Sequence, residues 1–442
     1  MAESVGFVSL GCAKNLVNTE QMIYLLREAG YSISETVDQV DLAVVNTCGF
    51  IEAAKSEAIE QILLLGQAKA EGRIGKLLVT GCLSQRYQDE IMEEMPEIDG
   101  VLGTGSYNDI VEAADRILRG EQFRRFGDIN APLEEPERVL STPPWYAYLR
   151  IAEGCDNRCA YCVIPSIRGR YRSRPMEELV QEARSMAASG VKELIVIAQD
   201  TSRYGLDLYH ERKLPELLRR LCRIDGIRWV RVHYLYPDEM SEELIDTLAN
   251  EEKIVKYLDI PIQHVNDGIL KKMRRRGSHA YLDSLFTRLR ERIPGLVLRT
   301  SLIAGLPGED EDAFEELCAF LKKHKLERVG AFVFSPEEGT PAAKMDFPPE
   351  DVAMRRADLL EEISSRVIDE YNERKCGSRE TVLCEGFDGE RCFGRSFAES
   401  PDIDGRVWFT ASQPVEPGEF VTVRIDGAED GELYGRLEVD GA

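Results

Sequence analysis

Long hydrophobic runs are absent from this sequence of 442 residues. Residues 194–198 are typical of its longest apolar stretches, whereas a helix that spans a bilayer needs about 18 or more apolar residues. The first residues, Met1 to Ser4, also lack the basic segment and the apolar core of a secretory signal. We therefore expect a cytoplasmic protein that has no contact with a membrane.

Positive charge is also scarce. The chain has 55 Lys and Arg residues against 79 Asp and Glu residues, which gives a net charge of −24. Affinity for nucleic acids rests largely on basic side chains that contact phosphates, so this balance disfavours RNA and DNA and favours a basic partner. Apolar residues still make up 43% of the chain, enough for a folded core, which excludes gross disorder.

The first part of the chain, residues 1–125, alternates short apolar runs with helical patterns. The apolar runs are 5–10, 42–45 and 77–79, and the helical patterns are 19–29 and 52–65. This order predicts a doubly wound α/β domain with a parallel sheet. Prolines and charged residues at 126–140 then indicate a linker between domains.

The rest of the chain divides into two further domains. Residues 141–375 repeat the strand–helix rhythm, which predicts an open or partial α/β barrel. Its candidate strands are 146–151, 193–198, 229–233, 257–260, 297–303 and 328–334. Residues 377–442 hold short alternating runs separated by Asp-Gly turns, which predicts a small antiparallel β-barrel.

Three cysteines, Cys155, Cys159 and Cys162, follow the first candidate strand of the second domain with the spacing C-x3-C-x2-C. Thiolates in a tight loop suit zinc or iron–sulfur clusters. A structural zinc ion needs a fourth Cys or His ligand, but the nearest downstream histidine is His210. Three cysteines can instead hold a four-iron cluster and leave one iron open to a small ligand.

This cysteine spacing, with Tyr161 before the last cysteine and a barrel-like rhythm after it, resembles the radical S-adenosylmethionine enzymes. The resemblance implies a 4Fe-4S cluster on Cys155, Cys159 and Cys162 whose open iron binds S-adenosylmethionine. It also implies that an electron from the cluster cleaves this cofactor and releases a radical that removes hydrogen from unactivated carbon.

Cys12, Cys48 and Cys82 form a second group, although 36 and 34 residues separate them. Each follows a candidate strand of the first domain. Because the carboxyl ends of parallel strands meet at one edge of a sheet, where ligands bind, we expect the three thiols to converge. The alternative is that cysteine is simply a common residue of buried strands. The other five cysteines, Cys222, Cys318, Cys376, Cys384 and Cys392, have no such pattern, and we expect them not to be ligands.

Two cysteine triads in this order resemble the methylthiotransferase family, and the resemblance covers essentially the whole chain. It implies an N-terminal methylthiotransferase domain, a radical S-adenosylmethionine domain and a C-terminal β-barrel called TRAM. It also implies a second 4Fe-4S cluster on Cys12, Cys48 and Cys82 that takes part in sulfur transfer. One S-adenosylmethionine would generate the radical and a second would donate the methyl group.

Several further residues are candidates for cofactor binding. Gly305 and Glu309 follow a barrel strand, where the family places part of its S-adenosylmethionine pocket. Gln199 follows an earlier strand, and Tyr161 belongs to the cysteine loop. Arg168 begins a row of alternating arginines at 168–174 that would share one face if extended and could hold a carboxylate. A basic run at 271–276 is more typical of a solvated helix end.

The resembled family divides into one branch that modifies an adenosine in transfer RNA and another that modifies an aspartate of the small-subunit ribosomal protein S-twelve. Residues 377–442 hold six arginines and no lysine against fifteen acidic residues, a net charge of −9. An acidic barrel repels RNA and attracts a basic ribosomal protein. The sequences of the segments 147–155, 199–205 and 261–265 also resemble those of the ribosomal-protein branch.

We therefore predict an enzyme that methylthiolates the β-carbon of an aspartate in protein S-twelve, with an electron donor as a further partner and RNA not a direct substrate. One alternative is a transfer-RNA adenosine methylthiotransferase, which would show salt-dependent RNA binding. A second alternative is an iron–sulfur electron carrier without enzymatic activity, which would have clusters with four protein ligands.

Overall fold

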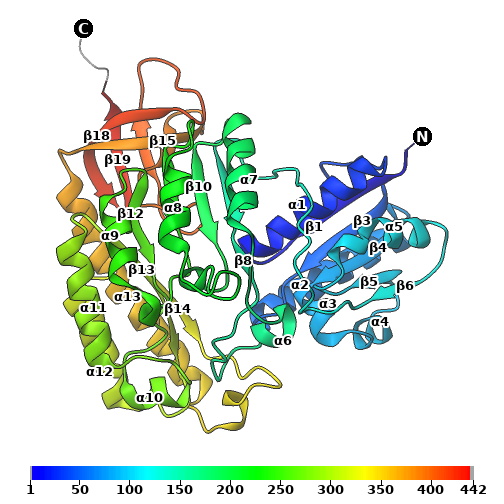
Figure 1. Ribbon diagram of the computed structural model, residues 1–442, viewed down its shortest axis with the longest axis horizontal. Coiled ribbons are helices and arrows are strands. Elements are labelled where there is room, and N and C mark those ends of the chain that lie inside the picture. The colour runs from blue at the N-terminus through cyan, green and yellow to red at the C-terminus, as the bar shows by residue number, and fades with distance from the viewer. Residues whose placement is uncertain (1, 439–442) are drawn as a thin grey trace.

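The structure is a computed structural model and describes residues 2–438 (Figure 1). A parallel sheet of six strands in the order β2-β1-β3-β4-β5-β6 forms its first part. The strands are β1 (Ser4–Ser9), β2 (Ser32–Ile33), β3 (Val40–Thr47), β4 (Ile74–Gly81), β5 (Gly100–Leu102) and β6 (Phe123–Arg125). The order reverses between β1 and β3, as in a doubly wound sheet, so the fold predicted for this part is confirmed.

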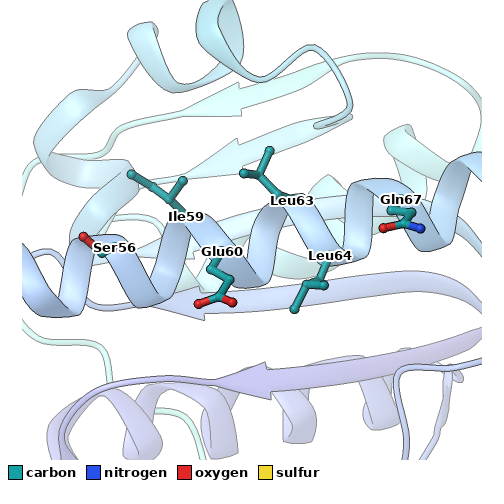
Figure 2. Close-up of a pocket in the computed structure, with 6 residues that line it drawn as sticks. All are labelled: Ser56, Ile59, Glu60, Leu63, Leu64 and Gln67. Atoms are coloured by element: carbon teal, nitrogen blue, oxygen red, sulfur yellow. The ribbon is translucent and has the colours of Figure 1, made fainter.

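Helices cover both faces of this sheet. They are α1 (Ala13–Glu28), α2 (Glu52–Ala70), α3 (Cys82–Tyr87), α4 (Glu90–Glu94) and α5 (Ile110–Leu118). Helix α2 buries Ala58 and Ile62 against β3 and β4, whereas α1 and α5 pack on the opposite face. The outer side of α2 carries a hollow of about 380 Å³ beside the exposed side chains of Leu63 and Leu64 (Figure 2).

A second parallel sheet, in the order β14-β13-β12-β11-β10-β7, forms the predicted open barrel, because β14 and β7 do not pair with each other. Its strands are β7 (Tyr146–Arg150), β10 (Glu193–Ile197), β11 (Trp229–Val232), β12 (Ile254–Asp259), β13 (Val297–Ala304) and β14 (Arg328–Val333). Each corresponds to a predicted strand within a few residues. A separate two-stranded sheet joins β8 (Ala152–Glu153) and β9 (Arg172–Ser173).

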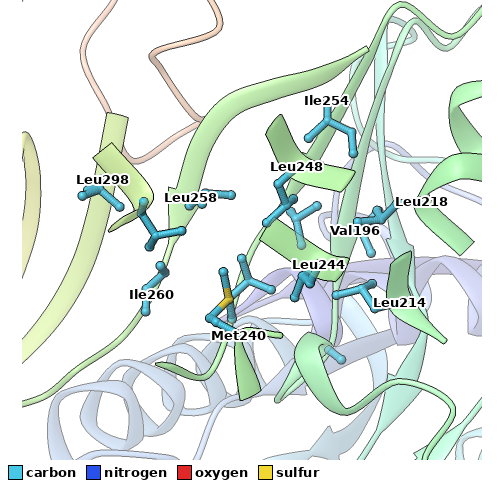
Figure 3. Packing of buried hydrophobic residues seen from close by; sticks show 14 of the residues in the cluster. Val196, Leu214, Leu218, Met240, Leu244, Leu248, Ile254, Leu258, Ile260 and Leu298 are labelled. Carbon is cyan, nitrogen blue, oxygen red and sulfur yellow. The ribbon is translucent and has the colours of Figure 1, made fainter. Parts of the chain in front are cut away.

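The helices of this domain mostly pack outside the curved sheet (Figure 1), but the first of them packs through Ile167 against Cys82 of α3. They are α6 (Ile164–Arg168), α7 (Met176–Ala188), α8 (Leu214–Cys222), α9 (Glu242–Asn250), α10 (Asp267–Lys272), α11 (His279–Arg292), α12 (Glu311–His324) and α13 (Glu350–Lys375). Branched and long apolar side chains fill the space between sheet and helices, for example Val196 and Leu258 of the sheet with Leu218 and Leu244 of α8 and α9 (Figure 3). Short 3-10 turns occur at Tyr107–Asp109, Thr201–Arg203, Pro237–Glu239 and Ala342–Lys344.

A closed five-stranded barrel follows α13. It consists of β15 (Arg379–Phe387), β16 (Cys392–Arg395), β17 (Val407–Thr410), β18 (Phe420–Glu429) and β19 (Glu432–Leu437). Four of its strand pairs are antiparallel as predicted, but β17 and β19 pair in parallel. This parallel pair closes the barrel between strands that are not neighbours in sequence, which alternating apolar residues do not reveal. No helix within residues 2–438 has the length and apolarity needed to cross a bilayer.

The predicted linker is firmly docked. Arg138 makes ion pairs with Glu20 of α1 at 2.6 Å and with Glu182 of α7 at 2.8 Å, so it joins the first two domains. Glu135 accepts two hydrogen bonds of 2.9 Å from Arg150 of β7. The charged residues of the predicted linker therefore pair with residues on both sides of it.

Glu193 at the start of β10 attaches the C-terminal barrel to the open barrel. It is fully buried, 2.7 Å from Arg231 of β11 and 2.8 Å from Arg395 of β16. Burial alone would raise the pKa of Glu193, but Arg395 and Arg231 outweigh it and lower the pKa below its ordinary value of 4.5. The stabilisation is therefore complete above about pH 4.5 and is lost as the pH falls through the lowered pKa.

We predict that Glu193→Ala destabilises the protein, because it leaves Arg231 and Arg395 buried without their shared partner. Breaking a buried pair in this way typically costs about 3–5 kcal/mol. The thermal midpoint should fall, and the C-terminal barrel should become more susceptible to limited proteolysis. Glu390→Ala is the control, since Glu390 is exposed and lies 3.9 Å from Arg391. Equal midpoints for the two variants would contradict this account of the interface.

Candidate functional site

Cys12, Cys48 and Cys82 lie at the same edge of the first sheet. They follow β1, β3 and β4, which are adjacent and parallel, and Thr47 at the end of β3 pairs with Gly81 at the end of β4. Cys12 is exposed, Cys48 half-buried and Cys82 buried. The structure thus brings the three sequence-predicted residues together, as parallel strand ends require.

The loops that carry Cys12 and Cys48 pack closely against each other at Gly11. Gly11 has a φ of +83°, and a Cβ atom on it would lie 2.7 Å from the Cys48 Cβ and 3.1 Å from the Cys48 sulfur, so only glycine permits this approach. Desolvation would raise the pKa of the Cys12 thiol, but Lys14 and Arg168 outweigh it and lower the pKa. Burial raises the pKa of Cys48 to about 11 and also raises that of Cys82, an effect that a bound metal cluster would reverse.

The second triad lies in the loop after β8. Cys159 is buried, whereas Cys155 and Cys162 are half-buried. The loop begins at Gly154, whose φ is +81° and where a Cβ would collide with the Arg170 carbonyl oxygen at 2.0 Å. The hydroxyl of Tyr236 is 3.6 Å from the Cys159 sulfur. Only glycine permits this close approach, so the tight loop that gathers the cysteines depends on residue 154.

Neither triad is arranged around a single ion. Among residues 2–438, no three His, Cys, Asp or Glu side chains are close enough to share one metal. In a four-iron cluster each cysteine binds a different iron, so the sulfurs need not converge on one point. The soft thiolate donors of both triads fit such a cluster.

The two triads face each other across one interface. Val163, next to Cys162, packs in the same apolar cluster as Cys82. Arg168 donates a hydrogen bond of 3.3 Å to the Cys82 sulfur and lies 3.4 Å from Glu153, two residues before Cys155. One side chain of the second domain therefore contacts the first triad and the loop that carries the second.

The prediction that residues 168–174 form an extended segment with their arginines on one face is wrong. Arg168 ends α6, and Gly169 with a φ of +76° turns the chain before β9. Arg168 and Arg174 are consequently buried, whereas Arg170 is exposed, so these side chains do not share a face. Arg168 is also bonded to Asn15 and Asn18 of α1 at 2.9 and 2.8 Å, and it lies beside the first triad.

The other predicted cofactor residues lie around the carboxyl ends of the barrel strands. Gln199 donates to Glu153 at 2.5 Å through its amide nitrogen, while its amide oxygen has no partner among the described residues. Tyr161 packs beside Ala160 and Met273. Glu309 accepts a hydrogen bond from the Gly305 amide at 3.0 Å and pairs with Arg356 of α13 at 2.9 Å. Its carboxylate thus holds the Gly305 loop in place instead of standing free.

Sequence reasoning missed two cations at the triads. Arg275, expected on a solvated helix end, is buried, with its guanidinium 4.1 Å from the ring centre of Tyr236 beside Cys159. Lys14, two residues after Cys12, is also buried, with its ammonium 3.3 Å from the ring centre of Tyr234. Its position two residues after a cysteine of the triad was the available signal. A polar cavity of about 290 Å³ lies nearby, lined by Arg150, Glu153 and Arg168 among others.

The remaining cysteines stay apart from the triads. Cys222 and Cys318 lie in the apolar core of the second domain, and Cys384 and Cys392 lie in that of the C-terminal barrel. Cys376 is exposed.

Three family models match separate parts of the chain. The model described as Uncharacterized protein family UPF0004 matches residues 4–103, the Radical SAM superfamily matches residues 149–321, and the TRAM domain matches residues 376–437. The first triad lies within the first of these matches, and the second triad lies within the second.

Curated proteins named ribosomal protein uS12 methylthiotransferase RimO match nearly the whole chain. The relative from Thermoanaerobacter sp. (strain X514) is 44% identical over 435 residues, which cover 98% of this chain and 99% of the relative. The relative from Lachnoclostridium phytofermentans is 47% identical, with coverage of 98% and 99%. The relative from Symbiobacterium thermophilum is 46% identical, with coverage of 99% and 92%. This chain belongs to the uS12 methylthiotransferase family. The resemblance that the cysteine motifs indicated is confirmed.

Solved structures of other proteins share the fold of this chain. The radical S-adenosylmethionine methyltransferase TsrM from Kitasatospora setae superimposes with a TM-score of 0.57 at 15% identity, covering 87% of this chain and 82% of TsrM. The cobalamin-dependent S-adenosylmethionine radical enzyme OxsB gives a TM-score of 0.51 at 14% identity, covering 82% and 56%.

We predict that Arg168→Met lowers the reduction potential of a cluster reconstituted on the first triad. Hydrogen bonds and positive charge at cluster sulfurs tune the potential, and loss of a cation is expected to shift it by on the order of tens of millivolts. A redox titration followed by electron paramagnetic resonance measures each cluster separately. Arg170→Met, at an exposed neighbouring site, should shift neither. A shift confined to the second triad would contradict the contact with Cys82.

Proposed function

We propose that this chain is a radical S-adenosylmethionine methylthiotransferase that adds a methylthio group to the β-carbon of an aspartate in ribosomal protein uS12, the protein called S-twelve above. The observation that carries the proposal is the pair of cysteine triads on facing loops of one interface. Similarity over nearly the full length to curated uS12 methylthiotransferases supports the substrate.

Each triad would hold one 4Fe-4S cluster and leave one iron without a protein ligand. Cys155, Cys159 and Cys162 would hold the radical-generating cluster; the sulfur-handling cluster would be held by Cys12, Cys48 and Cys82. When bound, these clusters and two molecules of S-adenosylmethionine supply the hydrogen-abstracting radical, the sulfur and the methyl group. An external electron donor is also required.

The residues at the barrel mouth would orient S-adenosylmethionine. The amide oxygen of Gln199, which has no partner among the described residues, would accept a hydrogen bond from the ligand. Gly305, with a φ of +81°, lets the backbone approach the ligand, and Glu309 fixes this loop through Arg356. Tyr161 packs between the cysteine loop and the barrel wall.

The domain interface would exclude water from the space between the triads. Arg150 and Arg168 are both buried there and both lie close to Glu153, at 3.0 and 3.4 Å. On the other side, Glu337 of the loop after β14 pairs with Arg86 at 2.6 Å and with Lys55 at 3.1 Å. These ion pairs close the first domain over the barrel mouth, which protects a reactive radical from side reactions.

The C-terminal barrel would dock the basic substrate. Eight acidic side chains are exposed on its described part: Asp388, Glu390, Asp402, Glu416, Glu419, Asp426, Glu429 and Asp430. Other acidic residues face the second domain, such as Asp404, which accepts a hydrogen bond of 2.7 Å from Tyr257. The outward acidic surface attracts a basic protein and repels RNA.

The direct test is an anaerobic assay of the reconstituted enzyme with a reductant, S-adenosylmethionine and either uS12 or transfer RNA. Mass spectrometry should find a methylthio group on an aspartate of uS12, and none on transfer RNA. Modification of the RNA while uS12 stays unmodified would overturn the proposal.

We predict that reversing the barrel charge weakens docking without affecting chemistry. The double variant Glu416→Lys with Glu429→Lys should raise the KM for uS12 by about tenfold at low salt, because rim charges act mainly on encounter, and it should leave kcat unchanged. Glu60→Lys on the exposed side of α2 is the matched control and should leave KM unchanged. Unchanged KM in the double variant would contradict docking through this surface.

A further inference from the structure

Lys14 is a buried cation that has no carboxylate partner among residues 2–438. Its side chain lies in the first turn of α1, and the residue is 8% exposed. Lys55, the other buried lysine, pairs with Glu52 and Glu337. No carboxylate of residues 2–438 lies within ion-pair distance of Lys14, whose ammonium makes a 3.5 Å contact with the Ala198 carbonyl oxygen and also contacts Tyr234. An ammonium group has three donors and is costly to bury without a partner.

The position of Lys14 links the first triad to the mouth of the barrel. Ala198 follows β10, and Tyr234, whose ring lies under the Lys14 ammonium, follows the adjacent strand β11. The carboxyl ends of barrel strands are where ligands bind. Lys14 therefore reaches from the loop of Cys12 into the space where a substrate of the barrel would lie.

The residues around Lys14 hold its side chain in place but supply no carboxylate to pair with its ammonium group. Tyr234 has a φ of +60°, a strained conformation for a bulky residue that is typical of functional sites. The nearby carboxylate of Asp259 is occupied, since it pairs with Arg299 at 3.2 Å and accepts the Tyr234 amide hydrogen bond at 3.2 Å. The aromatic face stabilises the cation but supplies no carboxylate to it.

We propose that Lys14 binds the side-chain carboxylate of the substrate aspartate and thereby selects aspartate over its amide. This inference rests on the proposed function and deepens it. The carboxylate is bonded directly to the β-carbon, so an ion pair with Lys14 fixes the carbon that reacts. An ion pair away from water also discriminates strongly against a neutral asparagine, because the buried ammonium then stays unpaired.

The test compares two uS12 peptides that differ only in aspartate or asparagine at the modified position. Binding of each is measured by calorimetry on the cluster-loaded enzyme. The wild-type protein should prefer the aspartate peptide by on the order of tenfold to a hundredfold. Lys14→Met should abolish this preference by weakening the aspartate peptide alone, and Lys14→Arg, which keeps the charge, should retain most of it.

Two controls make the result specific. Lys69→Met removes a half-buried lysine of the same domain that pairs with Asp99, and it should leave the preference unchanged. Iron content and the paramagnetic resonance signals of both clusters should be unchanged in Lys14→Met. Loss of the first cluster, or an unchanged preference for aspartate, would overturn the inference. If the wild-type enzyme fails to modify uS12 at all, the proposed function fails instead.

Discussion

The hydrogen bond from the Arg168 guanidinium to the Cys82 sulfur is the contact on which the two-site arrangement depends. Arg168 belongs to the loop-and-helix segment that follows the second triad, whereas Cys82 starts α3 in the first domain. Through Glu153 the same side chain reaches the residues that begin the second cysteine loop. One buried cation therefore contacts both the first triad and the residues that precede the second.

Buried charge has a comparable role at the other domain boundaries. Arg138 joins α1 to α7, and Glu193 joins two arginines that belong to different domains. Buried ion pairs add little net stability but strongly penalise any arrangement that separates the partners. The domains are thus held in one relative orientation, which a reaction between two cofactors requires. Lys14 departs from this pattern because its partner is proposed to arrive with the substrate.

Much of the fold and the cysteine grouping could be predicted because they follow from local rules. Buried parallel strands appear as apolar runs, and cysteines that directly follow such runs must share an edge of the sheet. The parallel pairing of β17 with β19 could not be found in this way, since it depends on closure between distant strands. The same holds for Arg168, which is buried against the facing domain, and for Arg275, which is buried against Tyr236 of a distant segment of its own domain. The α6 helix explains the failure of the extended arginine row, because five residues are too few for a clear helical period.

The central claim is that the chain carries two iron–sulfur clusters on facing triads. Anomalous scattering at the iron edge from crystals of the anaerobically reconstituted protein tests it most directly. The account predicts two compact iron peaks, one beside Cys12, Cys48 and Cys82 and the other beside Cys155, Cys159 and Cys162. A single peak at the second triad, with the thiols of the first triad bare, would contradict it.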